Sequence, residues 1–485
     1  MRTGSADLNA ARRRVELHRS AQETRDLIVV GGGITGVGVA LDAASRGLDV
    51  TLLEAEDLAF GTSRWSSKLV HGGLRYLATG DVATARESAL ERHRLMTAIA
   101  PHLIHALPQL LPFSAGVTVA QRAAGGVGMG LGDLLRMRAH TPRRVLPAPR
   151  LVSARRALQL TPALAPSGLR GGMLSYDGQL VDDARLVVTV ARTAASRGAR
   201  ILTRVRALEL RANGVTAEDA LTGERLELKA RAVVNATGVW AGSLDPSLTL
   251  RPSRGTHIVV DAADLGSPAA ALTVPHEGSI SRYVFALPQS HGRIIIGLTD
   301  EDAPGTVPAV PRPTEPEIEF LLASVNRVLA TPLRRDQVRG AFAGLRPLVD
   351  AGEADGSTAD ISRRHLVSES EGVVSVLGGK LTTYRRMAED AVDRVCAVRG
   401  LSTGPCVTAS LRLVDDAPIA GDEARIAEGI EVTPAQVAFA VRAEGALTAD
   451  DVLDRRTRIG LVDADRARCA PIVSDLVARA RAEVG

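Results

Sequence analysis

The residues with the clearest chemical meaning are three glycines, Gly31, Gly33 and Gly36, spaced as Gly-x-Gly-x-x-Gly. They follow an apolar run at 27–30, which predicts a buried parallel strand, and they precede a predicted helix at 37–46. Glycines in such a turn let the main chain approach a pyrophosphate, whose charge the helix N-terminus stabilises. Glu54 ends the next predicted strand, where a carboxylate can accept hydrogen bonds from an adenosine ribose. The pattern predicts a dinucleotide-binding unit.

Two later segments look like further strands of the same unit. Residues 231–240 and 373–384 each contain a short apolar run that ends in small residues, and the second leads into a helix predicted at 382–398. That helix presents another positively polarised N-terminus to a ligand. A nucleotide domain split into three pieces of sequence favours FAD over NAD.

These segments are similar to one family. The stretches 62–77 (TSRWSSKLVHGGLRYL) and 378–385 (GGKLTTYR) resemble signatures of FAD-dependent glycerol-3-phosphate dehydrogenases, within the D-amino-acid-oxidase-like flavoproteins. Similar stretches lie at 175–186, 254–260, 344–348 and 361–363, in the family's order. The resemblance covers residues 26 to about 397. It implies oxidation of sn-glycerol 3-phosphate to dihydroxyacetone phosphate, with FAD reduced and then reoxidised by a membrane quinone.

The resemblance also selects residues for the substrate. A base must take the hydroxyl proton, and His71 and His257 are the candidates because imidazole titrates near neutral pH. Guanidinium groups clamp phosphate oxygens, which selects Arg75, Arg346 and Arg363, with Arg346 also able to stabilise a developing alkoxide. Tyr76 adds a hydroxyl donor. The sequence leaves open which group is the base.

The predicted cofactor contacts come from four parts of the chain. Small residues and backbone N–H groups are expected along the dinucleotide, and Lys380 is expected near the flavin N1 and O2 edge, where the reduced ring becomes anionic. The full predicted set is Gly31, Gly33, Thr35, Gly36, Glu54, Ser66, Ser67, Lys68, Val205, Gly238, Gly379, Lys380, Leu381 and Thr382.

Other polar residues are interpreted as structural. Asp182 and Asp183 are expected to cap a helix at 184–196, and Thr299 and Asp300 to form a turn at a strand end. The same interpretation applies to four further histidines, His102, His105, His276 and His291.

Composition limits the class of protein. The 485 residues are 45% hydrophobic and 24% charged, with a net charge of +4, which is typical of a large globular enzyme. Of the 59 lysines and arginines only Lys68, Lys229 and Lys380 are lysine, so single arginines carry little information. The sequence contains no block of basic residues interleaved with aromatic residues, so it does not indicate binding to nucleic acid. The three cysteines are expected to be reduced, as in a cytoplasmic protein, and no metal site is predicted.

The predicted fold is α/β, with a discontinuous Rossmann-like FAD domain, an antiparallel-sheet substrate or cap domain and a C-terminal helical domain. Cap strands are predicted at 256–261, 283–287 and 293–298, and C-terminal helices at 434–443, 449–456 and 464–484. The predicted division is a flexible N-terminal extension (1–23), the FAD domain (24–100, 174–250 and 341–397), the cap domain (101–173 and 251–340) and the helical domain (398–485).

The sequence predicts a protein that lies on a membrane without crossing it. The uncharged stretch 95–121 contains three prolines, so we expect the end of a helix and a buried strand rather than a transmembrane segment. A peripheral protein on the cytoplasmic face of the membrane is expected, with residues 121–138 as a candidate amphipathic element.

Three other functions are alternatives to a quinone-reducing dehydrogenase. They are a glycerophosphate oxidase that reduces oxygen to hydrogen peroxide, an amine or 2-hydroxy-acid oxidase, and a non-catalytic flavoprotein. A homodimer is left open.

Overall fold

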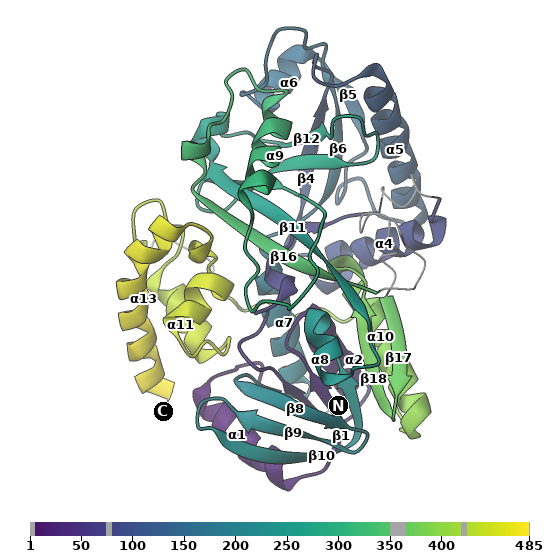
Figure 1. Ribbon diagram of the computed structural model, residues 1–485, viewed down its shortest axis with the longest axis vertical. Coiled ribbons are helices and arrows are strands. Elements are labelled where there is room, and N and C mark those ends of the chain that lie inside the picture. The colour runs from purple at the N-terminus through teal and green to yellow at the C-terminus, as the bar shows by residue number, and fades with distance from the viewer. Residues whose placement is uncertain (1–4, 74–79, 350–364, 419–423, 485) are drawn as a thin grey trace.

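The computed structural model describes residues 5–73, 80–349, 365–418 and 424–484, and two sheets organise them (Figure 1). The first sheet has the order β17-β18-β10-β1-β2-β7, and β9 joins β10 to β8. Its strands are β1 (Arg25–Val30), β2 (Val50–Leu53), β7 (Arg200–Leu202), β8 (Val205–Arg211), β9 (Gly214–Asp219), β10 (Glu224–Asn235), β17 (His365–Ser370) and β18 (Val373–Gly378).

The central strand β1 explains the layers around this sheet. It pairs in parallel with β2 and with β10, and its side chains alternate between the two faces. Leu27 and Val29 join a core with α2 (Ile34–Ser45), α7 (Asp183–Ser196) and α10 (Tyr384–Arg399). Ile28 and Val30 face the opposite core under β8 and β9. Burial on both faces is why β1 is a continuous apolar run.

The second sheet is mostly antiparallel, as predicted, with β12 and β4 as a parallel pair. Its order is β15-β11-β14-β13-β12-β4-β6-β3, with β16 on β11 and β5 on β6. Its strands are β3 (Leu69–Val70), β4 (Ile104–Pro112), β5 (Arg150–Val152), β6 (Gly172–Leu180), β11 (Leu250–Asp261), β12 (Ala271–Pro275), β13 (Tyr283–Gln289), β14 (Arg293–Gly297), β15 (Glu301–Asp302) and β16 (Gly340–Val349). The helices on it include α4 (Val82–Arg94), α5 (Val119–Arg138), α6 (Ala154–Leu160) and α9 (Glu315–Asn326).

Three segments expected in the FAD domain belong to the second sheet instead. β6 pairs along its length with β4, β16 pairs with β11 from Gly340 to Val349, and β3 pairs with β6. Each of the three predicted FAD-domain ranges, 24–100, 174–250 and 341–397, therefore includes a strand of the second sheet. The physical reason is that an apolar strand does not encode its partner, which long-range pairing decides.

The N-terminal extension is ordered from Ser5 onward, so its expected flexibility is wrong for the described part. Asn9 caps α1 (Ala10–Gln22) by accepting from the Arg12 N–H at 3.0 Å. Arg13 is buried and pairs with Asp219 at 2.5 Å, and Leu17 enters the core beside β1. A buried ion pair and an apolar contact hold this helix against the FAD domain.

The long uncharged stretch folds as predicted, into a helix end and the buried strand β4. Residues 121–138, the candidate amphipathic element, lie within the helix α5, and Thr118 and Gln121 form a capping box at its start. One of its glycines has a packing role: a Cβ at Gly125 would lie 2.4 Å from Leu111. Within the described part of the chain, no helix is both long and apolar enough to cross a membrane.

The C-terminal helices agree with the prediction. They are α11 (Pro434–Arg442), α12 (Ala449–Asp451), a π-helical continuation (Val452–Arg456) and α13 (Asp463–Val484). They share an apolar core of their own and lie beside both sheets (Figure 1). α8 (Ala241–Leu244) is a short helix after β10.

Candidate functional site

A cavity of about 900 Å³ lies between the two sheets, and its lining brings together most of the predicted site residues. At one end is the turn between β1 and α2. Gly31 has a φ of +113°, and a Cβ there would lie 2.4 Å from the Ala236 carbonyl oxygen. A Cβ at Gly36 would lie 1.8 Å from the Gly31 carbonyl oxygen, so Gly36 serves helix–strand packing. Gly33 begins α2 without a side-chain cap.

Glu54 lies at the end of β2 and lines the cavity. Its carboxylate accepts the Gly32 N–H at 2.6 Å and the Glu56 N–H at 2.8 Å. Desolvation nevertheless raises the pKa of Glu54 to about 7. The carboxyl group thus lies at a strand end in the position expected for a ribose acceptor. The Glu54 carbonyl oxygen also accepts the Val205 N–H at 2.8 Å, which brings Val205 to the same end.

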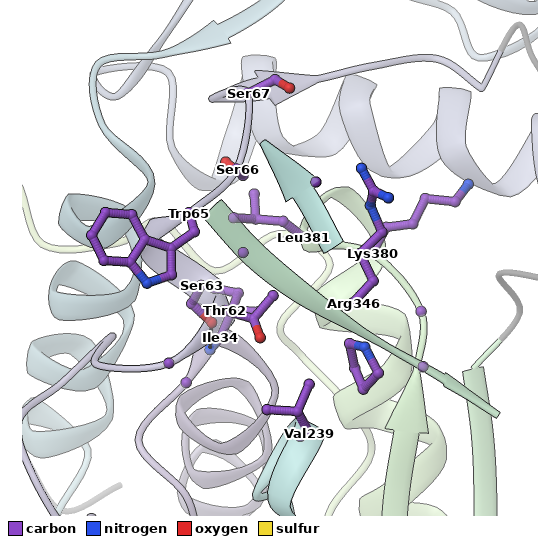
Figure 2. A pocket seen from close by; sticks show the side chains of 18 of the residues that line it. Ile34, Thr62, Ser63, Trp65, Ser66, Ser67, Val239, Arg346, Lys380 and Leu381 are labelled. Atoms are coloured by element: carbon purple, nitrogen blue, oxygen red, sulfur yellow. Dashed lines mark hydrogen bonds between the residues drawn. The ribbon is translucent and has the colours of Figure 1, made fainter. Parts of the chain in front are cut away.

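The loop after β2 supplies residues that the sequence pattern did not single out. Ser63 accepts the Ile34 N–H at 2.9 Å, and Thr62 donates to the Leu345 carbonyl oxygen at 2.6 Å. Figure 2 shows Ile34, Thr62 and Ser63 grouped together, with Trp65 and Ser66 following on the same chain segment. Ser63 therefore links this loop to the start of α2. The sequence signal for Ser63 is its place in the family-like stretch 62–77.

Asp183 anchors the next part of the loop. It accepts the Ser66 N–H at 2.9 Å, the Ser66 hydroxyl at 2.8 Å and the Lys68 ammonium at 2.9 Å. Although burial raises the pKa of this carboxyl, the charges of Lys68 and Arg458 and these hydrogen bonds bring it well below its usual range. Lys68, one of the predicted cofactor contacts, is thus buried in an ion pair with Asp183. Asp182 caps α7 as predicted.

The carboxyl ends of β10 and β18 contribute the remaining cofactor candidates. Gly238, Gly379, Leu381 and Thr382 line the cavity. Lys380 also lines it, and its ammonium donates to Ser88 at 2.7 Å. These parallel strands end at the same edge as β1, which is where open α/β sheets place their ligands.

Arg346 and His257 come from neighbouring strands and line the opposite part of the cavity. β11 pairs with β16 so that Ser253 faces Arg346 and His257 faces Phe342. The Arg346 guanidinium donates to Asp300 at 2.7 Å, to Ser253 at 3.2 Å and to the Thr299 carbonyl oxygen at 3.2 Å. Asp300, expected to be only a turn residue, therefore orients Arg346 at the cavity.

His257 is almost fully buried. Its Nε2 lies 2.8 Å from the Ser67 hydroxyl, and its ring stacks on Phe342 with centroids 4.8 Å apart. Desolvation, with the charges of Lys68 and Arg346, lowers the pKa of His257 to about 3. The imidazole is therefore neutral and able to accept a proton near neutral pH when an anion offsets those charges.

Two glycines create the room for these side chains, and sequence reasoning missed both. A Cβ at Gly255 would lie 2.5 Å from the Arg346 guanidinium, and a Cβ at Gly297 would lie 2.1 Å from the His257 ring. Both positions look like ordinary strand glycines in the sequence. Only the contact across the sheet gives them a role.

We expect Gly255→Ala to displace the Arg346 guanidinium and leave the fold intact, because the contacted atoms end a flexible side chain. A shift of this kind lowers the rate of substrate oxidation about tenfold or more. The rate at which substrate reduces the bound flavin measures the effect on the reaction. The melting temperature measures the effect on the fold. Gly130→Ala is the matched control, since a Cβ there meets nothing within 4 Å. An unchanged rate would show that Arg346 tolerates the shift.

Of the other residues predicted to contact the substrate, some lie in the described part of the chain and others do not. His71 lines the cavity. Arg75, Tyr76 and Arg363 lie outside the described residues, so their predicted roles stay predictions. Among the histidines interpreted as structural, His105 bonds Gln179 at 3.0 Å, whereas His276 lines the cavity.

Comparisons with known proteins agree with this arrangement. A family model described as FAD dependent oxidoreductase matches residues 26–385, and one described as the C-terminal domain of alpha-glycerophosphate oxidase matches residues 407–482. The chain is 52% identical to glycerol-3-phosphate dehydrogenase 1 of Mycobacterium tuberculosis, over 98% of this chain and 99% of that protein. It is 37% identical to glycerol-3-phosphate dehydrogenase 2 of the same organism, over 98% and 88%.

Solved structures show the same architecture. The glycerol-3-phosphate dehydrogenase of Bacillus halodurans, solved in complex with FAD, matches with a TM-score of 0.69 and 25% identity over 99% of this chain and 97% of that one. The L-alpha-glycerophosphate oxidase of Mycoplasma pneumoniae shares the fold, with a TM-score of 0.59 and 18% identity over 81% and 99%. The α/β fold with its second, antiparallel-rich sheet and C-terminal helices is therefore also the fold of the Bacillus halodurans protein.

Proposed function

Since the chain belongs to the family of FAD-dependent glycerol-3-phosphate dehydrogenases, we propose that it oxidises sn-glycerol 3-phosphate to dihydroxyacetone phosphate and passes the electrons to a membrane quinone. Its cofactor is FAD. One observation carries the proposal: a single cavity joins the glycine turn and Glu54 to the pair Arg346 and His257.

The residues at the first end of the cavity fit FAD. Gly31 and Gly33 line the cavity at the start of α2, where their backbone would hold the pyrophosphate, and Glu54 would accept hydrogen bonds from the ribose. FAD, when bound, supplies the hydride acceptor for the oxidation. The N–H groups and the Lys380 cation at the end of β18 would then stabilise negative charge at one edge of the flavin ring.

At the other end of the cavity, side chains of the protein accept the hydroxyl proton of the substrate and stabilise the negative charge that develops. We assign the hydroxyl proton of the substrate to Nε2 of His257 through the Ser67 hydroxyl, which lies 2.8 Å from it. The two negative charges of a bound phosphate ester offset the cations that depress the pKa of His257. Arg346, oriented by Asp300, stabilises the alkoxide that develops as the proton leaves. His71, which also lines the cavity, remains the alternative base.

We assign the phosphate group to Arg346 and to the predicted residues Arg75, Tyr76 and Arg363. Arginine forms two parallel hydrogen bonds with phosphate oxygens, so several arginines suit a dianion better than the single clamp that a carboxylate substrate needs. This argument favours a phosphate ester over the substrates of an amine or 2-hydroxy-acid oxidase.

The test of the proposed function is anaerobic stopped-flow reduction of the FAD-loaded protein. Glycerol 3-phosphate is expected to bleach the flavin absorbance, whereas glycine, a secondary amine or lactate is not. A protein that binds FAD but is not bleached by glycerol 3-phosphate would contradict the proposal and support a non-catalytic flavoprotein.

The acceptor is tested by reoxidising the reduced protein. We expect a ubiquinone or menaquinone analogue to reoxidise it faster than oxygen does. An oxidase is the second candidate because the model matching residues 407–482 is described from alpha-glycerophosphate oxidase. Rapid formation of hydrogen peroxide, at rates equal to those with the quinone, would favour that candidate.

We propose that α5 contacts the membrane that holds the quinone. Four apolar side chains on its outer surface are exposed by 41–65%, namely Val127, Leu131, Leu134 and Met137. Helical spacing places them on one stripe, which suits partial insertion into a lipid surface. Ala124, Gly128 and Met129 on the same helix line the cavity, so the helix lies between this stripe and the site.

We expect the double substitution Leu131→Gln and Leu134→Gln to weaken vesicle binding at least about tenfold, because burying even one leucine contributes roughly 1.5–3 kcal/mol. Co-sedimentation with vesicles of phosphatidylglycerol and phosphatidylethanolamine measures the loss. Leu221→Gln is the control, an exposed leucine in the turn between β9 and β10. Equal binding of the double variant and the control would exclude α5 as the contact surface.

A further inference from the structure

The C-terminal domain contacts the back of the cavity through the segment 455–462. Arg455 and Arg456 both pair with Asp57, at 2.6 and 2.9 Å. Although burial raises the pKa of the Asp57 carboxyl, the two arginines lower it to about 2. Asp57 begins the loop that carries Thr62, Ser63, Trp65 and Ser66 into the cavity lining. The C-terminal domain therefore holds the start of this loop by buried charge.

Arg458 holds the middle of the same loop. It is 8% exposed, and its guanidinium donates to the Arg64 carbonyl oxygen at 2.5 Å and to the Asp454 carbonyl oxygen at 2.6 Å. The guanidinium also lies 5.2 Å from the centre of the Trp65 ring. Its Nε is 3.2 Å from the Asp182 carboxylate. One planar side chain thus connects the C-terminal domain, the loop and the cap of α7.

From Trp65 a column of rings leads to His257. Trp65 stacks on Phe342 with centroids 5.5 Å apart, and Phe342 stacks on His257 at 4.8 Å. A Cβ at Gly344 would lie 2.6 Å from Trp65, so the close contact between the loop and β16 depends on that glycine. Val462 of the C-terminal segment packs in the same cluster as Phe342.

Hydrogen bonds alone do not fix the His257 ring. Its Nε2 contacts the Ser67 hydroxyl, while its Nδ1 has no hydrogen-bond partner among residues that the structure describes. An imidazole held by one hydrogen bond can rotate about it. The flat face of Phe342, only 13° from parallel with the imidazole, restricts that rotation.

We propose that Arg458 is a positioning residue for His257, acting through Trp65 and Phe342. The proposal rests on the proposed function, in which His257 accepts the proton of the substrate. It gives the C-terminal domain a part in catalysis: Arg458 sets the position of Trp65, Trp65 supports Phe342, and Phe342 fixes the plane of the imidazole.

A double-mutant cycle between Arg458 and His257 tests this role in the FAD-loaded protein. Arg458→Gln is expected to lower the limiting rate of flavin reduction about tenfold, since small displacements of catalytic groups have effects of this size. The dissociation constant for glycerol 3-phosphate and the FAD content should stay within twofold of the wild type. In a His257→Asn background, Arg458→Gln should cause no further loss.

The control is Arg481→Gln. Arg481 also donates to a main-chain carbonyl oxygen, but its acceptor, Leu447, lies within the C-terminal domain itself. We expect it to leave the reduction rate unchanged. An equal loss from Arg458→Gln with and without His257, or no loss from Arg458→Gln alone, would overturn the inference while the proposed function stands. If Arg458→Gln does not fold, Phe342→Leu replaces it in the same cycle, with the same expected non-additivity. A wild type that glycerol 3-phosphate does not reduce would instead overturn the proposed function itself.

Discussion

Replacing Arg346 by alanine is expected to slow flavin reduction by glycerol 3-phosphate about 10²- to 10³-fold while the protein keeps its FAD. The guanidinium is held by Asp300, Ser253 and the Thr299 carbonyl oxygen, so it is oriented before substrate binds. Loss of one such preorganised donor costs about 2.7–4 kcal/mol in the transition state. Anaerobic stopped-flow with varied substrate concentration separates the reduction rate from the dissociation constant.

Two further variants make this result specific. Arg339→Ala removes an exposed arginine next to the start of β16, which pairs with Asp261 at 2.7 Å, and should leave the reduction rate unchanged. Asp300→Asn keeps Arg346 but weakens its orientation, so its loss should be smaller than that of Arg346→Ala. If Arg346→Ala changed only the dissociation constant, Arg346 would be a phosphate ligand and not a stabiliser of the alkoxide.

Replacing His257 by asparagine is expected to lower the reduction rate about 10²- to 10⁴-fold, the range contributed by general base catalysis. The substitution leaves a polar side chain facing Ser67 but removes the proton acceptor. His105→Asn is the control, an exposed histidine that bonds Gln179. A reduction rate within threefold of the wild type would transfer the role of base to His71.

The same substitution should also change how the free energy of unfolding depends on pH. The folded pKa of His257, about 3, lies below its unfolded value of roughly 6.5, so the unfolded chain binds the proton first as the pH falls. The stability that comes from keeping this ring neutral is fully present above pH ~6.5 and is lost as the pH falls toward 3.

We therefore expect the wild type to lose more stability than His257→Asn between pH 8 and pH 5. Urea denaturation at both pH values measures the free energy of unfolding of each protein. A difference between the two proteins that does not change with pH would mean that His257 titrates equally in the folded and unfolded states.

Local patterns were enough to predict the nucleotide unit. The glycine spacing, the apolar strand and Glu54 lie within 30 residues, and their meaning depends on backbone geometry that the neighbouring residues determine. The C-terminal helices were predicted for a similar reason, since apolar periodicity and Pro434 at a helix start are local signals. The family signatures added Arg346, His257 and Lys380 to the list of site residues.

The contacts that the sequence did not reveal share a different cause. Lys68 is predicted to contact the cofactor, and nothing local in the sequence shows that it pairs with Asp183, 115 residues away. Asp300 was expected to be a turn residue, yet it orients Arg346 across 46 residues. α1 was expected to be flexible because nothing in its own sequence shows that Arg13 meets Asp219.

The sequence by itself determined the class of cofactor, the family and the residue types of the site, because these depend on short stretches with a fixed local geometry. Only the tertiary structure decided which side chains meet in the cavity, which glycines make room for them, and how Arg458 of the C-terminal domain reaches the Trp65 loop. The physical reason is that ion pairs, ring stacking and steric clearance act between strands and loops whose separation in sequence carries no record of their distance in space.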